Sequence, residues 1–171
     1  MAEKLNFEEV YEQNFRYVYN VVYMRVMHRE TAEDITSEVF VKAWKNYDRF
    51  DPEIATPVTW LCAIANNEVK MYLRKASTSN EIASDNIPEL ETEDEAEITA
   101  STMAINREAE RILSMLDQKD RDLLSLRLAA QLSFAEIAQI MEISPKAATE
   151  RYRRLIGRCR KLTEGLSMSD F

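Results

Sequence analysis

The sequence predicts an all-α fold with two small helical domains, an N-terminal helical bundle and a C-terminal helix-turn-helix, joined by an acidic linker. Three observations lead to this fold class. The chain has 171 residues, 46% of them apolar, but only two glycines and four prolines, so a core can form and turns are few. Apolar residues recur at steps of three and four, and no stretch alternates as a half-buried strand does. The net negative charge lies in the middle of the chain, between two parts that are together neutral.

The whole net charge of −8 is carried by residues 77–101, which hold eight acidic and no basic side chains. The flanking parts are together neutral, because residues 1–76 contain ten basic and twelve acidic residues and residues 102–171 contain twelve and ten. The acidic segment is rich in Ser and Thr and poor in aromatic residues, a composition typical of a solvated linker. We therefore expect an N-terminal domain at 1–76, a linker at 77–101 and a C-terminal domain at 102–171.

Three amphipathic helices are expected in the N-terminal domain. The first has an apolar face formed by Phe7, Tyr11, Phe15, Val18 and Val22. The second runs from about Thr31 to Tyr47, with a buried side comprising Ile35, Val39, Phe40, Ala43 and Trp44. After a loop at 48–56, Thr56 is expected to cap a third helix that begins at Pro57 and ends near Lys75.

The third expected helix has two contrasting faces. One is mostly apolar and comprises Leu61, Ile64, Glu68, Met71 and Tyr72. The other carries amides and cations without any acid, and is formed by Ala63, Asn67, Lys70 and Arg74 with Asn66 and Lys75 beside it. This second face suits contact with nucleic acid, and an ordinary solvated helix face is an equally good interpretation of these residues alone.

Two helix starts close together predict the helix-turn-helix. Ser133 and Glu136 have the spacing of a capping box, in which the hydroxyl caps the helix and the Glu three residues on caps back. Only a short run later, Ser144 is an N-cap residue and Pro145 occupies the first helical position. The second of these helices is expected to pack through Ala148, Tyr152, Leu155, Cys159 and Leu162.

The last helix is strongly basic within an acidic chain. It carries a single acid, Glu150, against seven cations, namely Lys146, Arg151, Arg153, Arg154, Arg158, Arg160 and Lys161. Such a charge on one helix of a helix-turn-helix predicts contact with nucleic-acid phosphates. A basic helix on a solvated surface is the alternative.

The remaining composition argues against other classes of protein. The single histidine, His28, has no evident nucleophile or metal partner, and no glycine-rich phosphate loop is present, so an enzyme, a metal site and a cofactor are not expected. Cys62 and Cys159 lie on apolar helix faces and are interpreted as buried free thiols. No apolar run approaches the ~20 residues needed to cross a membrane, and no signal-peptide pattern begins the chain, so we expect a cytoplasmic location.

Three motifs together resemble the extracytoplasmic-function (ECF) group of bacterial RNA polymerase sigma factors. Residues 32–44, AEDITSEVFVKAW, resemble the family's core-binding helix. Residues 60–67, WLCAIANN, followed by LRK at 73–75, resemble the helix that reads the −10 promoter element. Residues 126–162, which contain FAEIA and the pair Ile143–Ser144, resemble the helix-turn-helix that binds the −35 element.

This resemblance implies a role for each surface. Core RNA polymerase is implied to contact Asp34, Ser37, Glu38, Val41 and Lys42, whereas Phe40 and Trp44 are expected to hold the helix in its own domain. The −10 element is implied to contact Asn66, Asn67, Lys70, Arg74 and Lys75. The −35 element is implied to contact Ser144, Lys146, Ala147, Thr149, Glu150, Arg151, Arg153, Arg154 and Arg158. Core polymerase, promoter DNA and an anti-sigma factor are the implied partners, with no small-molecule substrate and no membrane insertion.

The sequence departs from the family pattern at several positions. The family usually has Gln at Ser37, Arg at Asn66 and an acid at Met71, and it often has Gly at Glu142. It also has Thr-Val-Lys where this chain has Ala-Ala-Thr at residues 147–149. Since several of these positions lie on the expected DNA-reading surfaces, the departures bear on promoter sequence rather than on the fold.

Several alternatives stay open at the level of sequence. Trp60 is either a stacking platform for bases or a core residue, and its apolar neighbours favour the core.

The acidic linker is either a plain tether or a competitor of DNA for the basic helix, or it occupies the RNA path in the polymerase. Stretched, 25 residues span roughly 80 Å, and relaxed about 28 Å, so the domains can lie together or apart. A stand-alone operator-binding regulator explains only the C-terminal half, and a helical protein adaptor does not explain the basic helix.

Overall fold

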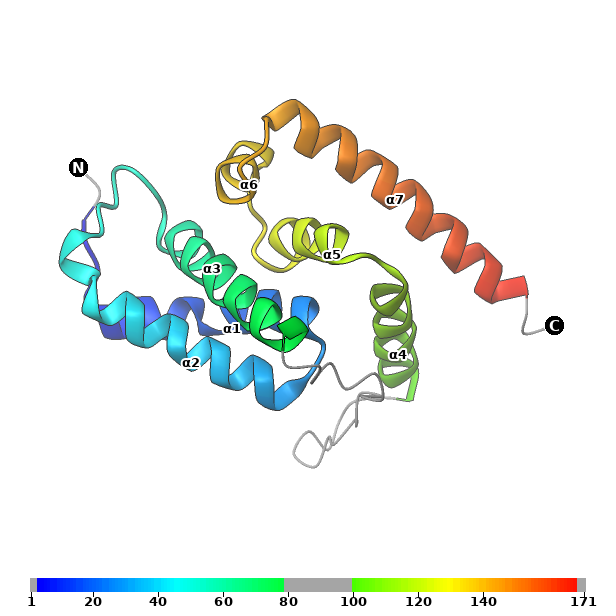
Figure 1. Cartoon of the computed structure of the whole chain (residues 1–171), viewed down its shortest axis with the longest axis horizontal. Helices are drawn as coiled ribbons and strands as arrows, with labels where there is room; N and C mark the ends of the chain where they lie inside the picture. The colour runs from blue at the N-terminus through cyan, green and yellow to red at the C-terminus, as the bar shows by residue number, and fades with distance from the viewer. Residues whose placement is uncertain (1–2, 79–99, 169–171) are drawn as a thin grey trace.

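The computed structural model describes residues 3–78 and 100–168, and within these ranges the chain is helical and contains no strand. The N-terminal part contains α1 (Phe7–Val26), α2 (Arg29–Lys45), the short 3-10 helix η1 (Tyr47–Arg49) and α3 (Pro57–Thr78). The C-terminal part contains α4 (Ala100–Met115), α5 (Gln118–Leu124), the π-helical turn η2 (Ser125–Ala129), α6 (Phe134–Met141) and α7 (Pro145–Met168) (Figure 1). The predicted all-α fold class is confirmed. Most of the expected linker, 79–99 with its acidic side chains, lies outside the described residues.

The helices α1, α2 and α3 pack against one another around one apolar cluster. Its buried members are Val10, Val18, Val22, Ala32, Ile35, Val39, Phe40, Ala43, Leu61, Ala65 and Val69. Asn6 begins α1 with a capping box, since its side chain accepts from the Glu9 amide and Glu9 accepts from the Asn6 amide. His28, which has no role in the sequence-based expectation, caps α2 by accepting from the Thr31 amide at 3.2 Å. As a result α2 begins at Arg29, earlier than predicted.

The expected apolar face of α1 was only partly right. Val18 and Val22 are buried as predicted, but Tyr11 is 42% exposed. The buried residues of α1 are Val10, Asn14, Val18, Val21, Val22 and Arg25. Tyr11 and Phe15 each follow one residue after a buried position, which turns them about 100° around the helix, and their rings pack along the edge of the buried side.

Trp44 was predicted to be buried with Phe40, and for Trp44 this is wrong. Phe40 is 5% exposed, as expected, whereas Trp44 is 65% exposed. Ala43 occupies the inward position of that last turn of α2 and is fully buried. Trp44 therefore points away from the bundle and prolongs the solvent-facing side of α2.

The helix-turn-helix forms with both predicted N-caps. The Ser133 hydroxyl accepts from the Glu136 amide at 3.2 Å and Glu136 accepts from the Ser133 amide at 2.7 Å. The Ser144 hydroxyl accepts from the Ala147 amide at 3.0 Å and so starts α7. Between them, Glu142 ends α6 in the left-handed conformation at φ 57°. Gly adopts this conformation without steric cost, whereas a residue with a side chain does not.

The helix α7 is tied to α5 through Asp120, whose side chain is only 1% exposed. Arg151 Nε donates to Asp120 Oδ1 at 3.1 Å and Arg158 Nη2 donates to Asp120 Oδ2 at 2.6 Å. Burial alone would raise the pKa of Asp120, but the hydrogen bonds from Arg158 and Arg151 together outweigh it, so that the pKa lies below its usual value. The predicted packing face of α7 is also confirmed, with Ala148 and Leu155 fully buried beneath it.

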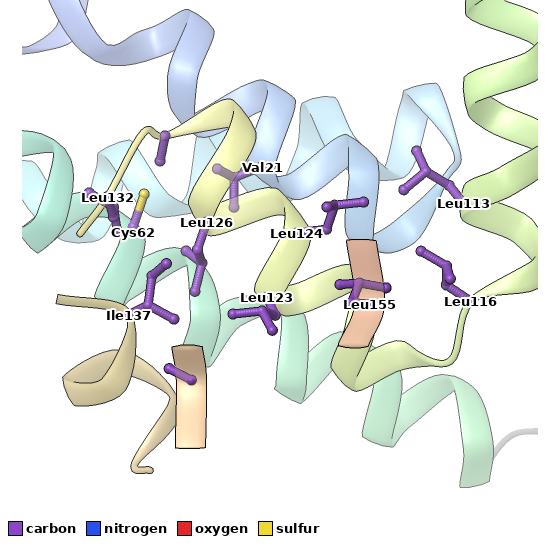
Figure 2. Close-up of a cluster of buried hydrophobic side chains, with 12 residues drawn as sticks. Val21, Cys62, Leu113, Leu116, Leu123, Leu124, Leu126, Leu132, Ile137 and Leu155 are labelled. Carbon is purple, nitrogen blue, oxygen red and sulfur yellow. The ribbon is translucent and has the colours of Figure 1, made fainter. Parts of the chain in front are cut away.

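The two halves of the chain share a second apolar cluster. Val21 of α1 and Cys62 of α3 belong to the same buried group as Leu123, Leu126 and Ile137 from the C-terminal half. Figure 2 shows Val21 and Cys62 beside the leucines of α5 and η2 and next to Ile137 of α6. The domains are therefore docked on each other, with α5 and η2 against α1 and α6 against α3.

Replacing Glu142 by Gly is expected to raise the free energy of unfolding by about 0.5–1 kcal/mol, because it relieves a left-handed backbone that disfavours side chains. Urea denaturation followed by circular dichroism measures it. The matched control Gln139→Gly, at an exposed position inside α6, should instead destabilise by about 1 kcal/mol. A loss of stability in Glu142→Gly would contradict the assigned backbone conformation.

Replacing Asp120 by Asn is expected to lower the free energy of unfolding at pH 7 by about 1–2 kcal/mol. This loss is smaller than for a fully buried ion pair, because both arginines are partly exposed to solvent. A carboxyl with a lowered folded pKa stabilises above its ordinary value of 3.8 and loses that effect as the pH falls through the folded pKa. The difference in the free energy of unfolding between wild type and variant, measured by urea titration, should therefore disappear towards pH 2–3. An equal gap at both pH values would contradict the role of the Asp120 charge, and Glu150→Gln on the exposed side of α7 serves as control.

Candidate nucleic-acid and polymerase-binding surfaces

The first turns of α7 present an exposed surface of the kind expected for reading a DNA groove. The side chains exposed there are Lys146, Ala147, Glu150, Arg153 and Arg154. Ser144 is exposed but occupied as the N-cap, and Thr149 is half-buried with its hydroxyl donating to the Pro145 carbonyl at 2.9 Å. The structure thus leaves Lys146, Ala147, Glu150, Arg153 and Arg154, a part of the predicted −35 set, exposed on the first turns of α7.

Two of the predicted phosphate contacts are already engaged within the protein. Arg151 pairs with Asp120 and lies 3.7 Å from Asp117, and Arg158 pairs with Asp120. Arg154 and Lys161 of the same basic stripe are exposed. The positive charge available to DNA is therefore centred on the exposed cations at 146, 153 and 154, while Asp117 and Asp120 reduce it near Arg151. No local pattern predicts these ion pairs, because Asp120 lies 31 and 38 residues away from Arg151 and Arg158 in the sequence.

The predicted −10 residues on α3 do not share one environment. Asn67, Lys70, Arg74 and Lys75 are exposed. Asn66, in contrast, is 4% exposed and its Nδ2 donates to the Ile140 carbonyl of α6 at 3.3 Å. In the docked arrangement Asn66 is therefore covered by the helix-turn-helix and faces no solvent.

A second contact joins the same two helices. Thr59 Oγ1 at the start of α3 donates to Glu136 Oε1 at 3.1 Å. The backbone N–H of Ser133 is the main cause that holds the pKa of Glu136 below its usual value, with smaller contributions from the Ser133 hydroxyl and from Thr59. Glu136 thus serves two purposes, since it caps α6 and anchors α6 on α3.

The expected apolar face of α3 was wrong at its C-terminal end. Met71 and Tyr72 were placed on that face, and both are exposed. The last fully buried residue of α3 is Val69, and in the following turn Leu73 still packs against the cluster while Met71 and Tyr72 are exposed. Lys70, Arg74 and Lys75 surround an exposed Met and Tyr there, which makes this end of the helix both basic and apolar.

The outward side of α2 carries a continuous exposed stripe. Asp34, Ser37, Glu38 and Val41 follow one another at steps of three, one and three, and all are exposed. Trp44, which the sequence analysis assigned to the core, continues the stripe by a further three residues. Lys42 lies beside it and forms an ion pair with Glu68 of α3. A large exposed aromatic at the end of a polar stripe is a common feature of protein-binding surfaces.

Trp60 is a structural residue in this arrangement. Its ring lies 4.8 Å from that of Phe50 and 6.1 Å from that of Tyr47, and it is half-buried against the cluster of α1, α2 and α3. The packing supports the core interpretation over the stacking platform. Within the loop before α3, Ile54 is 84% exposed.

The other polar candidates have ordinary roles. Cys62 is buried and Cys159 is half-buried, both as free thiols, and burial raises the pKa of Cys62 to about 12. Among the described residues no group of His, Cys, Asp and Glu is arranged to hold a metal ion. In the same part of the chain, none of the helices has the length and hydropathy needed to span a bilayer.

Comparison with protein families gives two matches in the order of the two domains. Residues 10–78 match the model of Sigma-70 region 2, and residues 106–159 match that of Sigma-70, region 4. The chain is 30% identical over 140 residues to the ECF RNA polymerase sigma factor BldN of Streptomyces coelicolor, which covers 79% of this chain and 52% of BldN. The RNA polymerase sigma factor YlaC of Bacillus subtilis is 28% identical over 82% of both chains. SigM of the same organism is 26% identical over 82% of this chain and 84% of SigM.

Solved structures show the same fold. The sigma factor RpoE from Bartonella quintana, in complex with the anti-sigma factor NepR, superposes with a TM-score of 0.76 at 19% identity and covers 92% of this chain and 96% of RpoE. CnrH, in complex with the cytosolic domain of CnrY, gives a TM-score of 0.64 at 21% identity and covers 96% of this chain and 89% of CnrH. With both sigma-70 regions matched in order, the chain belongs to the ECF group of RNA polymerase sigma factors, generally non-catalytic proteins that direct promoter-specific transcription initiation.

Proposed function

We propose that this protein binds core RNA polymerase through α2, reads a −10 element with α3 and reads a −35 element with α7, acting in the cytoplasm without catalysis of its own. The proposed domains are 1–76 and 102–171, with 77–101 as the linker. The observation that supports the proposal is the combination, in one chain, of an exposed surface on the second helix of the helix-turn-helix with an exposed stripe on α2. The sequence of α2 resembles the family's core-binding helix, and both sigma-70 regions are matched.

The proposed polymerase surface consists of the exposed side chains of α2. Asp34 and Glu38 offer charge, Ser37 a hydroxyl and Val41 an apolar contact, and Trp44 adds a large aromatic at the end of the stripe. Tryptophan is one of the residue types most enriched among those that contribute much of the binding energy of an interface. All of these residues are accessible while the two domains are docked, so that polymerase can meet the protein in this arrangement.

The proposed −10 surface is the exposed face of α3. Asn67 offers a donor and an acceptor to base edges, and Lys70, Arg74 and Lys75 offer positive charge to phosphates. Asn66 can take part only after α6 has left α3, because its amide is buried against Ile140. Docked domains therefore represent a resting form, and use of the full −10 surface requires them to part.

The proposed −35 surface is the N-terminal half of α7. Lys146, Ala147, Thr149, Glu150 and Arg153 lie on the turns that reach base edges in a major groove. Arg154 is proposed to contact phosphates. Arg151 and Arg158 are proposed to contact phosphates as well, while they remain paired with Asp120. This surface is open in the docked form, so duplex with a −35 element is accessible before the −10 element is.

An anti-sigma protein is the third proposed partner. RpoE, the similar structure with the higher TM-score, was solved with the anti-sigma factor NepR. A protein that held the two domains together would keep Asn66 covered, and would thus block initiation without touching the −35 surface.

Transcription in vitro with core bacterial RNA polymerase and fragmented genomic DNA tests the proposal. Discrete new start sites that need this protein, with two shared upstream elements, are the expected result. Stable binding of free duplex without any new start would point instead to a stand-alone regulator, and neither activity would point to an adaptor.

Replacing Glu38 by Lys is expected to weaken binding to core polymerase about tenfold, because it reverses a charge in the middle of the exposed α2 stripe. Fluorescence anisotropy of the labelled protein titrated with core measures the affinity, and circular dichroism checks that helicity is kept. Glu12→Lys makes the same charge change at an exposed position of α1 and should leave the affinity alone. Equal affinities for wild type and Glu38→Lys would remove α2 from the proposed interface.

Replacing Asn67 by Ala is expected to slow promoter opening about tenfold while core affinity stays within about twofold, since the lost contact to a base edge is worth about 1–3 kcal/mol. Permanganate footprinting of the opened strand reports the first quantity and anisotropy the second. The control Asn20→Ala removes an exposed amide from α1 and should change neither. Parallel losses of opening and core affinity in Asn67→Ala would indicate a folding defect rather than a base contact.

A further inference from the structure

The contact between the domains has a charged centre within an apolar surround. Arg25 at the end of α1 has a fully buried side chain, and its Nε donates to Asp122 Oδ1 of α5 at 2.6 Å. Gln118, one turn earlier on α5, donates to the same carboxylate oxygen at 2.9 Å and to the Arg25 carbonyl at 3.2 Å. The apolar side chains of this interface, including Val21, Leu124 and Leu126, belong to the cluster that both domains share.

The Arg25 guanidinium is poorly compensated in this position. Its Nη1 and Nη2 are buried, and no acceptor among the described residues lies within hydrogen-bond distance of either. The Nε of Arg121, which belongs to the same patch through its bonds to Gln118 and Met27, is likewise buried without an acceptor. Burial of a cation with so few partners opposes the attraction of the ion pair, because the lost hydration is only partly replaced.

These groups are buried only while the domains are docked. Asp122 lies on α5 and Arg25 on α1, so separation of the domains returns both charges to water. The polar patch therefore lowers the stability of the docked form relative to an apolar interface of the same size. A misaligned docking would leave both charges buried and unpaired, so the same patch also selects one register.

We propose that the Arg25–Asp122 pair is a release latch, which fixes the register of the docked domains while keeping that docking weak enough for core polymerase to open it. The claim that the pair sets the register and limits the strength of docking rests on the interface alone. The claim that core polymerase opens the docked form rests on the proposed polymerase binding. The shared apolar cluster supplies the attraction, and the latch limits it. Polymerase binding to α2, which the docked form leaves free, can then be coupled to exposure of the Asn66 face of α3.

Two variants of the full chain should shift docking in opposite directions. Asp122→Asn keeps an acceptor for Arg25 Nε but removes the counter-charge, so the docked population relative to the open one should fall at least about tenfold. The double variant Arg25→Met with Asp122→Leu replaces the pair by apolar side chains of similar size, so the docked population should rise about tenfold. Glu12→Leu with Arg16→Met makes matching charge removals on the exposed side of α1 and should change nothing.

Small-angle X-ray scattering of the free protein tests the interface without polymerase. Added urea, kept below the unfolding transition seen by circular dichroism, brings docked and open forms into a measurable balance. Asp122→Asn should expand at lower urea than wild type, and the apolar double variant at higher urea. Expansion of the double variant at the same or lower urea than wild type would overturn the proposal, even if Asp122→Asn failed to fold.

Affinity for core polymerase tests whether polymerase binding is coupled to opening of the docked domains. The apolar double variant should bind core about tenfold more weakly, because part of the binding free energy is needed to open the more stable docked form. The control variant should keep wild-type affinity. Unchanged affinity together with tighter docking would overturn the coupling to polymerase. Absence of core binding by the wild type would overturn the proposed function, and the scattering result for the latch would stand separately.

Discussion

The packing of α5 and η2 against α1 is the constraint on which the rest of the structure depends. It joins two helical domains into one body through a shared apolar cluster, and it brings α6 onto α3. The consequence is unequal exposure of three surfaces. The α2 stripe and the first turns of α7 face solvent, while Asn66 of α3 lies beneath Ile140. Under the proposed function, this packing lets the protein meet polymerase first and expose its full −10 surface afterwards.

Charge is used differently in different parts of the molecule. The acidic excess lies in 77–101, and the two domains are together neutral. On α7 some basic side chains face solvent, on the surface proposed to bind DNA, while Arg151 and Arg158 pair with Asp120 and so fix the helix to α5. At the domain interface, the buried Arg25–Asp122 pair weakens the contact instead, because Arg25 lies in an apolar region with few acceptors. The first arrangement strengthens a domain, and the second limits the attraction between domains.

Local patterns predicted the elements and long-range contacts decided the sites. The caps at Ser133 and Ser144, the packing face of α7 and the three N-terminal helices follow from spacing within a few residues, and all are present. The sequence failed where a helix face depends on what lies against it. Trp44 and Tyr72 lie at helical spacing with apolar residues, yet both are exposed in the part of the chain that the structure describes. Asn66 looked like part of a polar face, and a carbonyl 74 residues away buries it. Arg25 and Asp122 are 97 residues apart, so no periodicity could have paired them.

The distance between the domains, in the free protein and on core polymerase, tests the central claim most directly. Spin labels at Gln13→Cys on α1 and Gln139→Cys on α6, both exposed positions, report it by pulsed electron resonance. Cys159 is replaced by Ala, and Cys62 stays in place because it is buried and its thiol pKa is raised to about 12. One narrow distribution in the free protein, moving to longer distances when core is added, is the predicted result. A broad, long distribution in the free protein, or the same narrow one on core, would contradict the account.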